Sequence, residues 1–419
     1  MITPLGLAHG PIRPGPGQVR NVDVRQTRRV RDERLTVDVA VLGAGAAGLS
    51  LAWHLAQAGP AAPSVALLER ERSAPARTWC SWGPAAMSGP AAGAVAAAWR
   101  SVDVVDPAGG RQRLDLAPSA YRMIRSPDFV RVVSAELGRT TRLAAEVARI
   151  EDDPAAAYAV VHAADGGQVR ARWVFDTRPP VLPRARTAWV QHFRGWTVRT
   201  GEDRFDPSSA VLMDFRTPQP DRAVSFGYVL PTSPREALVE WTGFGRTPLD
   251  GAGYDRALRH YAREVLGLDA YEMTAVEQGT IPMVDAVLPR ATGPRTFRLG
   301  AAGGATRPST GYTFTAAQRQ AEQVAAALLA GRHPAPPPAY PARHLWMDGL
   351  LLRALDSGRL AGAQFFPALF REHPVDRVLR FLDGRTSLAE DLAIMRTSPL
   401  VPMARTAVER ALTRGAGGR

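Results

Sequence analysis

A glycine-rich turn near the start of the chain limits its fold more than any other feature. Residues 43–48 read GAGAAG, follow an apolar run at 37–42 and precede a small-residue stretch at 49–58 that suits a helix. A second apolar run, 65–68, comes next and is followed at once by Glu69. This order of strand, glycine turn, helix, strand and acid is typical of dinucleotide-binding folds.

Each part of this pattern has a physical role. Gly43 makes the tight turn, Gly45 lets the backbone approach a pyrophosphate, and Gly48 allows close packing of the helix on the strand. The N-terminus of the helix offers free N–H groups to phosphate oxygens. Glu69 lies about 20 residues past the last glycine, where an acid accepts hydrogen bonds from a ribose diol. The turn therefore predicts a dinucleotide site.

The composition argues against several classes of function. All 52 basic residues are arginine and they are spread along the chain, so the net charge of +12 does not indicate a nucleic-acid partner. Without lysine, no lysine Schiff base can form. Cys80 is the only cysteine, so we expect no intrachain disulfide and a reducing, cytoplasmic compartment. The eight histidines lack metal-ligand spacing, and no metal site is expected.

The first 34 residues differ from the rest of the chain. Residues 1–34 contain seven arginines with several Pro and Gly, but no apolar segment that would make a secretory signal. We expect a disordered basic arm, and an arm that touches acidic lipid is the alternative. The run 39–59 is long enough to span a bilayer, but it carries the glycine turn, so we predict no transmembrane helix.

Helix-like and strand-like periods alternate along the chain, which predicts an α/β fold that is α+β overall. We expect a discontinuous Rossmann-like dinucleotide domain in residues 35–180 and 276–332. Short strands separated by turn signals in residues 181–275 predict an inserted antiparallel sheet that would bind a substrate. Residues 340–419 follow a proline-rich linker and are expected to be helical.

A second glycine-rich turn follows the predicted strand 296–300 and precedes a predicted helix at 313–329. It would place another helix N-terminus beside the first turn, as flavoproteins do for the ribityl and isoalloxazine end of FAD. Arg125, in the segment IRSPDF, is a candidate partner for the phosphates or the ribityl chain. We therefore predict an FAD-binding domain. The candidate cofactor residues in the second turn are Gly303, Gly304, Thr310 and Gly311.

Two acids lie on predicted strands of the inserted sheet. Glu240 and Asp214 both stand between apolar neighbours, and each is a candidate for facing inward. A carboxylate in an apolar pocket has its pKa raised, so it can hold a proton at neutral pH and deliver it. For Asp214 the alternative is a structural ion pair with Arg216, since residues two apart on a strand share a face.

Aromatic residues cluster in sequence near these acids and the second glycine turn. Electron-rich rings stabilise cations at close range. They are more often core than pocket, but their position makes four of them candidate pocket residues: Phe226, Tyr228, Trp241 and Tyr312.

Taken together, these motifs resemble the lycopene cyclases, the FAD-type enzymes that close the ends of linear carotenoids. The likeness covers most of residues 36–405 and rests on the order and spacing of its motifs. These read DVAVLGAGAAGLSLAWHL, YRMIRSPDF, VFDTRP, QHFRGW, LMDFR, SFGYVLP, ALVEWTGF, GTIPM, TRPSTGYTF, FFPALF and FLDGRT.

The resemblance implies an isomerase, an intramolecular lyase that works on reduced FAD without net redox change, with NADPH as the reductant. A ψ-end of lycopene would be protonated at its terminal double bond, attacked by the neighbouring double bond, and deprotonated to a β-ring. In relatives of plant type, a glutamate implicated in catalysis falls at Glu240, and the MDW/FR motif places Asp214.

The chain departs from the family pattern at two positions of the second turn. Relatives of plant type have a histidine where Arg307 precedes the PSTGY segment, and a guanidinium cannot act as a general acid, although it can hold a flavin anion. The superfamily has an aspartate that holds the ribityl chain where Ala301 stands here, and backbone amides of 303–306 would replace it.

Lycopene dissolves in membranes, so the resemblance also implies peripheral contact with the inner face of the cell membrane. The apolar C-terminal helices near Arg353, Arg359 and Arg371 are a candidate surface for that contact. A helical lid over the core is the alternative for the same helices.

Two other functions fit parts of the pattern. One is a flavin redox enzyme of the same superfamily, such as a polyprenyl or geranylgeranyl reductase or a hydroxylase, which would consume NADPH in proportion to product. The other is a flavin-binding subunit or lipid carrier without catalysis.

Overall fold

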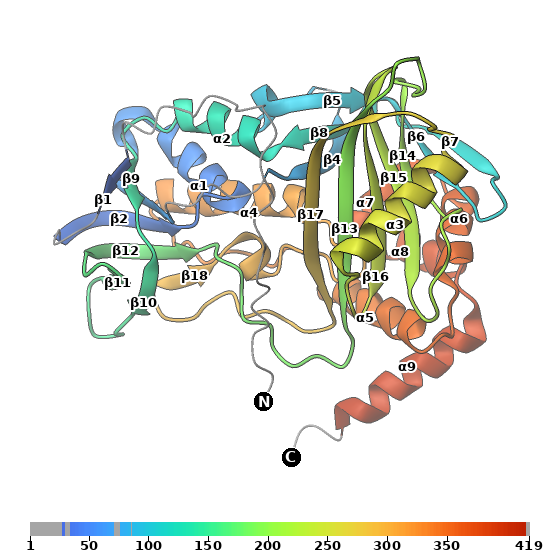
Figure 1. Cartoon of the computed structure of the whole chain (residues 1–419). Helices are drawn as coiled ribbons and strands as arrows, with labels where there is room; N and C mark the ends of the chain where they lie inside the picture. The colour runs from blue at the N-terminus through green and yellow to red at the C-terminus, as the bar shows by residue number, and fades with distance from the viewer. Residues whose placement is uncertain (1–26, 30–33, 71–75, 85, 416–419) are drawn as a thin grey trace.

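Two sheets lie side by side in the computed structural model of the chain, joined by a smaller sheet and flanked by helices (Figure 1). The structure describes residues 27–29, 34–70, 76–84 and 86–415. The predicted basic arm falls outside these residues except at its end, where 27–29 and Arg34 lie in strands. None of the helices in the described part of the chain is long and apolar enough to cross a membrane.

The eight-stranded sheet holds the glycine turn. Its strands run in the order β1-β9-β3-β2-β12-β11-β10, with β18 also paired to β12. The strands that neighbour β2 run parallel to it, and their apolar residues are buried on both faces, as in parallel sheets covered on both sides. The bounds are β1 Thr27–Arg29, β2 Arg34–Leu42, β3 Val65–Glu69, β9 Thr141–Ala144, β10 Val147–Glu151, β11 Ala159–Ala163, β12 Gln168–Asp176 and β18 Thr296–Arg298.

Three helices cover one face of this sheet, namely α1 (Ala46–Ala56), α2 (Ser126–Ala135) and α4 (Phe314–Leu329). α1 begins directly after the glycine turn and packs along α4, which begins after the second glycine turn. The two turns therefore meet at one end of the sheet, the carboxyl end of β2 and β18. Ligands of open α/β sheets bind at this end.

The seven-stranded sheet has the order β17-β13-β16-β15-β14-β6-β7 and is largely antiparallel. Its strands alternate between two apolar faces. One face packs on α3 (Gly251–His260) and the π-helical turn η4 (Tyr261–Val265), and the other faces the C-terminal helices. The bounds are β6 Ser101–Val105, β7 Arg111–Asp115, β13 Ala188–Arg199, β14 Ser209–Asp214, β15 Val224–Ser233, β16 Glu236–Gly245 and β17 Glu272–Val284.

The large sheet extends beyond the predicted insertion 181–275 on both sides. β17 starts at Glu272 and continues to Val284, so the expected boundary at 275/276 falls within a strand. β6 and β7 come from the segment 101–115, which lies within the range predicted for the dinucleotide domain. Pairing between strands far apart in the chain leaves no mark on local periodicity, so the pattern could not reveal either extension.

A three-stranded sheet, β4-β8-β5, joins the two large sheets. Its strands are β4 Thr78–Pro84, β5 Val95–Trp99 and β8 Ser119–Arg125, and short 3-10 turns are found at η2 Gly59–Ala61, η3 Ala92–Ala94 and η5 Gly300–Gly303.

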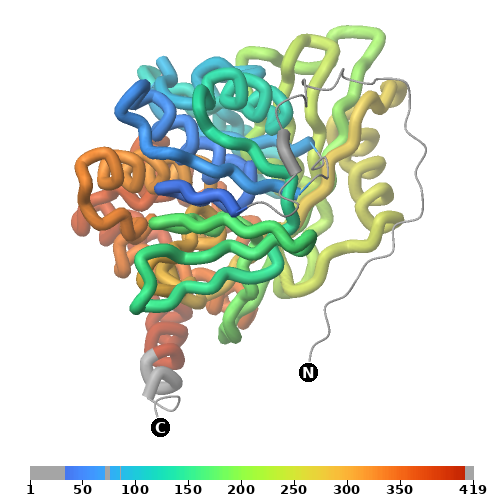
Figure 2. Tube along the Cα trace, turned by 90° about the vertical axis from the view of Figure 1, so that its left-hand side faces the viewer, coloured from blue at the N-terminus to red at the C-terminus, as the bar shows by residue number. Residues whose placement is uncertain are grey.

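Five helices form the C-terminal part of the described chain. In Figure 2 this orange and red segment and the yellow helix α3 lie on opposite sides of the molecule, which agrees with their packing on opposite faces of the large sheet. The bounds are α5 Ala342–Asp356, α6 Gly362–Glu372, α7 Val375–Leu382, α8 Leu388–Met395 and α9 Leu400–Gly415. The predicted class, an α/β fold with an antiparallel sheet and a helical C-terminal part, is confirmed.

Candidate active site

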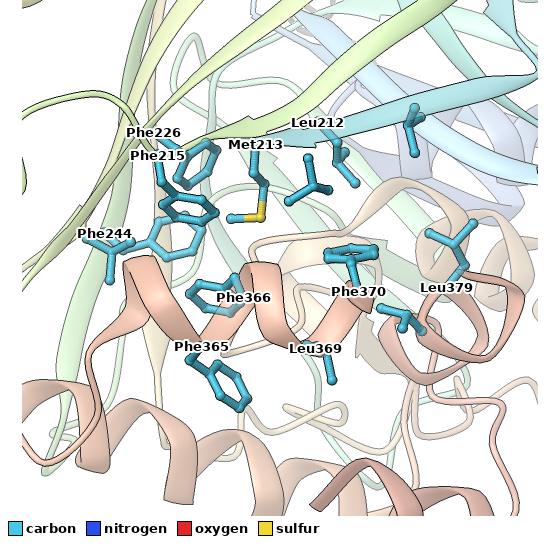
Figure 3. Close-up of a cluster of buried hydrophobic side chains, with 14 of the residues drawn as sticks. Leu212, Met213, Phe215, Phe226, Phe244, Phe365, Phe366, Leu369, Phe370 and Leu379 are labelled. Carbon is cyan, nitrogen blue, oxygen red and sulfur yellow. The ribbon is translucent and has the colours of Figure 1, made fainter. Parts of the chain in front are cut away.

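A cavity of about 1070 Å³ lies between the large sheet, the second glycine turn and the C-terminal helices. Its walls are mostly apolar, and aromatic side chains come from both sides. Figure 3 shows Phe366 and Phe370 of α6 pointing toward Phe226 and Met213 of the sheet. The apolar tail of the chain therefore covers the cavity, which favours the predicted lid for α5–α7.

Glu240 points into this cavity from β16. It is buried, and its Oε1 accepts a hydrogen bond of 2.7 Å from the Thr242 hydroxyl on the same strand face. Glu277 of β17 lines the same cavity, and its Oε2 accepts a hydrogen bond of 2.8 Å from the Thr78 hydroxyl. Between the two strands runs β13, where Gly195 pairs with both glutamates. The cavity thus holds two carboxyl groups in one row across three strands.

Burial raises the pKa values of both groups, and the charge of Glu277 adds to the shift of Glu240. Desolvation, followed by the charge of Glu277, raises the pKa of Glu240 to about 8, and the Thr242 hydrogen bond opposes this only in part. Desolvation also raises the pKa of Glu277, while the Thr78 hydrogen bonds and the charges of Arg125 and Arg77 oppose the shift. At neutral pH Glu240 therefore carries a proton in an apolar cavity.

A hydroxyl and thiol cluster lies beside these acids. The Tyr228 hydroxyl donates to Cys80 Sγ at 2.9 Å and is 2.6 Å from the Tyr121 hydroxyl. The Tyr312 ring meets the edge of Trp82 at a centroid distance of 4.5 Å. Burial raises the pKa of the Cys80 thiol to about 12 and the pKa values of the phenols as well, so the cluster stays neutral. These rings form a π-rich, uncharged wall.

The first glycine turn has the shape that a pyrophosphate requires. A side chain at Gly48 would collide with the Gly43 carbonyl, and Gly43 itself has a positive φ of 103°. At Gly45, by contrast, a Cβ would meet nothing within 4 Å, so the space over the turn is open. Gly45 also caps α1 without a side-chain hydrogen bond. Glu69 accepts a hydrogen bond of 2.6 Å from the Ala44 N–H, beside that open space.

The second turn lines the cavity with Gly303, Gly304, Thr310 and Gly311. Two buried polar atoms here, Thr310 Oγ1 and Gln191 Oε1, have no hydrogen-bond partner among the residues that the structure describes. Such atoms call for a polar ligand. Together with the open first turn, they fit an FAD whose pyrophosphate lies at α1 and whose ring system extends toward the cavity.

Three predicted site residues lie elsewhere. Asp214 is on the opposite face of the sheet, where it pairs with Arg216 at 2.5 Å and accepts a 3.0 Å hydrogen bond from the Tyr261 hydroxyl. Trp241 also faces away from the cavity and packs on Tyr254. Arg125 is exposed at the start of α2 and does not line the cavity, although its charge reaches Glu277.

The physical reason is strand alternation and one bulge. Glu240 and Trp241 are consecutive on β16, so they cannot both face the cavity. On β14 a register shift between Val211 and Asp214 lets Leu212 and Met213 both face inward and turns Asp214 outward. The predicted alternative for Asp214, an ion pair with Arg216, is what the structure contains.

Arg307 joins the second turn to the C-terminal helices. It is fully buried, and its Nη2 lies 3.0 Å from Asp348 Oδ1 of α5. The guanidinium also donates to the Phe381 carbonyl and lies over the Phe381 ring, 4.6 Å from its centroid. The Ser309 hydroxyl donates to the same Asp348 carboxylate at 2.8 Å. Asp348 therefore balances the charge of Arg307. The bonds of Arg307 hold the second turn against α5 and α7, and we call this arrangement the Arg307 clamp.

Three residues that line the cavity, Glu277, Gln191 and Tyr121, were not predicted from the sequence. Glu277 lies in the segment VEQGTIPM, just before the motif GTIPM quoted above. Its spacing of four from Ile281 puts both residues on one strand face, and this was the only local sign that Glu277 faces the cavity. Gln191 opens the quoted motif QHFRGW, but nothing local indicates that β13 passes beneath Gly311. Tyr121 opens YRMIRSPDF, where only Arg125 was considered.

The far end of the cavity reaches the last two helices, where Ile394, Met395, Ser398 and Met403 line it. Arg353 and Arg359 are turned inward here, since both bond to Glu409 of α9. The exposed apolar side chains of this region are instead Leu388, Leu392, Leu400, Val401 and Val408.

Sequence and structure comparisons agree with this architecture. A family model described as lycopene cyclase protein matches residues 38–408. No curated protein shows significant similarity to the chain.

Several solved structures are similar to this one over most of its length. A geranylgeranyl bacteriochlorophyll reductase-like protein of Thermoplasma acidophilum has a TM-score of 0.58 at 13% identity, covering 89% of this chain and 99% of that one. A flavin-dependent brominase has a TM-score of 0.58 at 15% identity, with coverages of 90% and 100%. A flavoprotein/dehydrogenase of Cytophaga hutchinsonii has a TM-score of 0.56 at 14% identity, with coverages of 90% and 99%. At such identities the likeness shows the fold, which is the fold of flavoproteins.

Proposed function

The chain belongs to the lycopene cyclase family, and on that premise we propose that it converts the ψ-ends of lycopene to β-rings in a reaction that depends on reduced FAD but has no net redox change. One observation carries the proposal: Glu240 is a carboxyl group that remains protonated at neutral pH inside an apolar, aromatic-walled cavity. Protonating an isolated double bond needs an acid of this kind, held away from water.

The proton of Glu240 starts the proposed reaction. It passes from the carboxyl oxygen to the terminal double bond of the ψ-end, leaving a tertiary carbocation and the Glu240 carboxylate. The neighbouring double bond supplies the electron pair of the new carbon–carbon bond and moves the charge into the ring. Loss of a ring proton restores a double bond, so one proton enters and one leaves, and the product is an isomer of the substrate.

The cavity walls protect and stabilise the cation. Tyr312 and Tyr121, which pack on Trp82 behind them, offer ring faces and edges without charge, and electron-rich faces attract cations. Phe226, Phe366 and neighbouring side chains of the lid keep water from trapping the cation. In this account Asp214 holds Arg216 and Tyr261 in place on the outer face and takes no part in proton transfer.

FAD is the proposed cofactor, with NADPH as its reductant. The pyrophosphate would be held by the N-terminus of α1 and the turn at Gly43–Gly48, the ribose by Glu69, and the ring system by the second turn with Gln191 and Thr310. When bound in its reduced, anionic form, the flavin supplies a fixed negative charge that favours a nearby cation. The role of this chain is to orient it and to exclude water.

Access from a membrane is part of the proposal. The cavity ends among residues of α8 and α9 whose neighbours Leu388, Leu392, Leu400 and Val401 are exposed. Arg385, Arg396 and Arg405 are exposed in the same segment, and cationic side chains around apolar ones suit an anionic lipid surface. We place the protein at the cytoplasmic face of the cell membrane, in peripheral contact.

Expression in a bacterium that accumulates lycopene tests the proposed function. Chromatography of the extracted pigments should show cyclic carotenoids at the expense of lycopene, and the Glu240→Gln variant should leave lycopene unchanged while retaining FAD. Lycopene that persists beside soluble, flavin-loaded protein would contradict the proposal. Products with saturated double bonds would instead support the redox alternative.

A further inference from the structure

Glu240 and Glu277 belong to different strands but line the same cavity. Gly195 of β13 lies between them, paired with Glu240 on one side and Glu277 on the other. A Cβ on Gly195 would lie 3.4 Å from both Glu240 Cβ and Glu277 Cγ. It would also lie 2.9 Å from Leu238 Cδ1, so the glycine leaves room over the middle strand that only the apolar Leu238 side chain shares with the two glutamates.

The two carboxyl groups have unequal surroundings. Glu277 receives the 2.8 Å hydrogen bond from Thr78 and lies within reach of the positive charges of Arg77 and Arg125. The Glu240 side chain accepts a hydrogen bond only from the Thr242 hydroxyl, and no ion pair to it is found among the described residues. Negative charge is therefore better accommodated on Glu277, and a proton is better placed on Glu240.

Few other titratable groups face the pair. The Cys80 thiol of β4 is close to both acids and stays neutral, because burial raises its pKa to about 12. On the far side of the sheet, Tyr254 of α3 is within electrostatic reach of Glu240 and of Arg194. Thus Arg77 and Arg125, both on the Glu277 side, are the cations that act on the pair from the described elements around it.

We propose that Glu240 and Glu277 share a single proton, and that Glu277 is a positioning residue whose negative charge keeps that proton on Glu240. The use of the proton in ring formation rests on the proposed function, but its sharing does not. The two groups line one apolar cavity on either side of Gly195, and the charge of Glu277 raises the pKa of Glu240, so ionising both at neutral pH is unfavourable and the pair binds one proton. After each turnover the proton lost from the ring returns to the pair, and the starting state is restored.

Infrared difference titration of the purified flavoprotein, without any carotenoid, tests the sharing directly. The stretching band of a protonated carboxyl group should be present at neutral pH in the unmodified protein and absent in Glu240→Gln. In Glu277→Gln the band should remain at low pH, but its midpoint should fall by about one pH unit or more, because the like charge is gone. Glu272→Gln, on the same strand but exposed, is the matched control and should leave the midpoint unchanged.

A second variant guards against misfolding of the first. Thr78→Val removes the hydroxyl donor from Glu277, so the pair should hold its proton more strongly and the midpoint should rise. A midpoint that does not move in either variant would overturn the proposal, as would a neutral-pH band that survives Glu240→Gln. A protein that shows the shared proton but forms no rings would contradict the proposed function alone.

Discussion

At the scale of residues, Asp214 and Glu240 show how surroundings decide the chemistry of a buried carboxylate. Both are on neighbouring parts of one sheet, and both are almost fully buried. Asp214 has an arginine and a phenol as partners, so its charge is balanced where it stands. Glu240 has a hydroxyl and a second acid, so it retains its proton. In the proposed reaction, the first therefore has a structural role and the second supplies the proton.

Substitution of these two residues should separate the roles. Glu240→Gln keeps the shape and removes the proton donor, so ring formation should fall by about 10²- to 10⁴-fold with stability preserved. Asp214→Asn leaves Arg216 without its counter-charge, and the free energy of unfolding should fall by about 3 kcal/mol. Cyclisation assays on purified protein and urea unfolding curves measure the two effects. Full stability with lost cyclisation in Asp214→Asn would contradict the assignment.

The pH dependence of the rate follows from the raised pKa of Glu240. The reaction needs the protonated acid, which is present below the folded-state pKa and is lost as pH rises through about 8. Thr242→Val removes a hydrogen bond that stabilises the carboxylate, so the alkaline limb of the rate profile should move to higher pH. Rates measured under single-turnover conditions across the pH range would show this. A shift to lower pH in Thr242→Val would contradict the acid role.

At the scale of elements, the sequence predicted what local patterns encode. The order of strand, glycine turn, helix and strand from Val37 to Glu69 is present as β2, α1 and β3. Strand alternation also made Glu240 a candidate. The same rule excludes Trp241, because consecutive strand residues face opposite sides of a sheet. The other features of the site could not be predicted from local sequence. Glu277 joins the site only because β17 pairs with β13, and Asp214 leaves it because of a bulge on β14.

Two glycines of the first turn, Gly48 and Gly45, should respond differently to substitution by alanine. Gly48→Ala would place a Cβ against the Gly43 carbonyl, so the strand and helix must move apart and the fold should lose stability. Gly45→Ala meets no protein atom within 4 Å and should fold normally, but its methyl group would occupy the approach of the pyrophosphate. Thermal unfolding and flavin absorbance of the purified variants should therefore show a stable protein without FAD for Gly45→Ala. Full flavin loading in that variant would argue against the assigned cofactor position.

The Arg307 clamp links the second glycine turn to the C-terminal helices. It ties the second glycine turn to α5 and α7, and these helices close the cavity. The position where related enzymes of plant type carry a histidine thus serves here to hold the lid on the flavin half. The sequence could not show this, because Asp348 lies 41 residues away on another element.

At the scale of the whole molecule, the cavity connects two halves with different tasks. The parallel sheet presents two glycine turns at one end, and the antiparallel sheet presents the acids. The lid extends from this junction to the exposed apolar residues of α8 and α9 (Figure 1). In the proposed function, a long apolar substrate enters past these exposed residues and brings one end to Glu240.

Vesicle binding should depend on the exposed residues of α9. Replacing Leu400 and Val401 by Asp removes apolar area and adds negative charge, so flotation with anionic vesicles should decrease several-fold while FAD content stays unchanged. Met273→Asp, an exposed apolar position on β17, is the control and should bind vesicles as the parent does. Equal flotation of all three proteins would contradict membrane contact through α9.

The central claim is that a reduced flavin assists acid-driven ring closure without giving up electrons. The most direct measurement counts NADPH oxidised and rings formed, in the absence of oxygen, with purified FAD-loaded protein and lycopene in detergent micelles. We predict many rings per NADPH consumed, since one reduction of the flavin supports repeated turnovers. One NADPH oxidised for each product molecule would contradict the account and identify a redox enzyme.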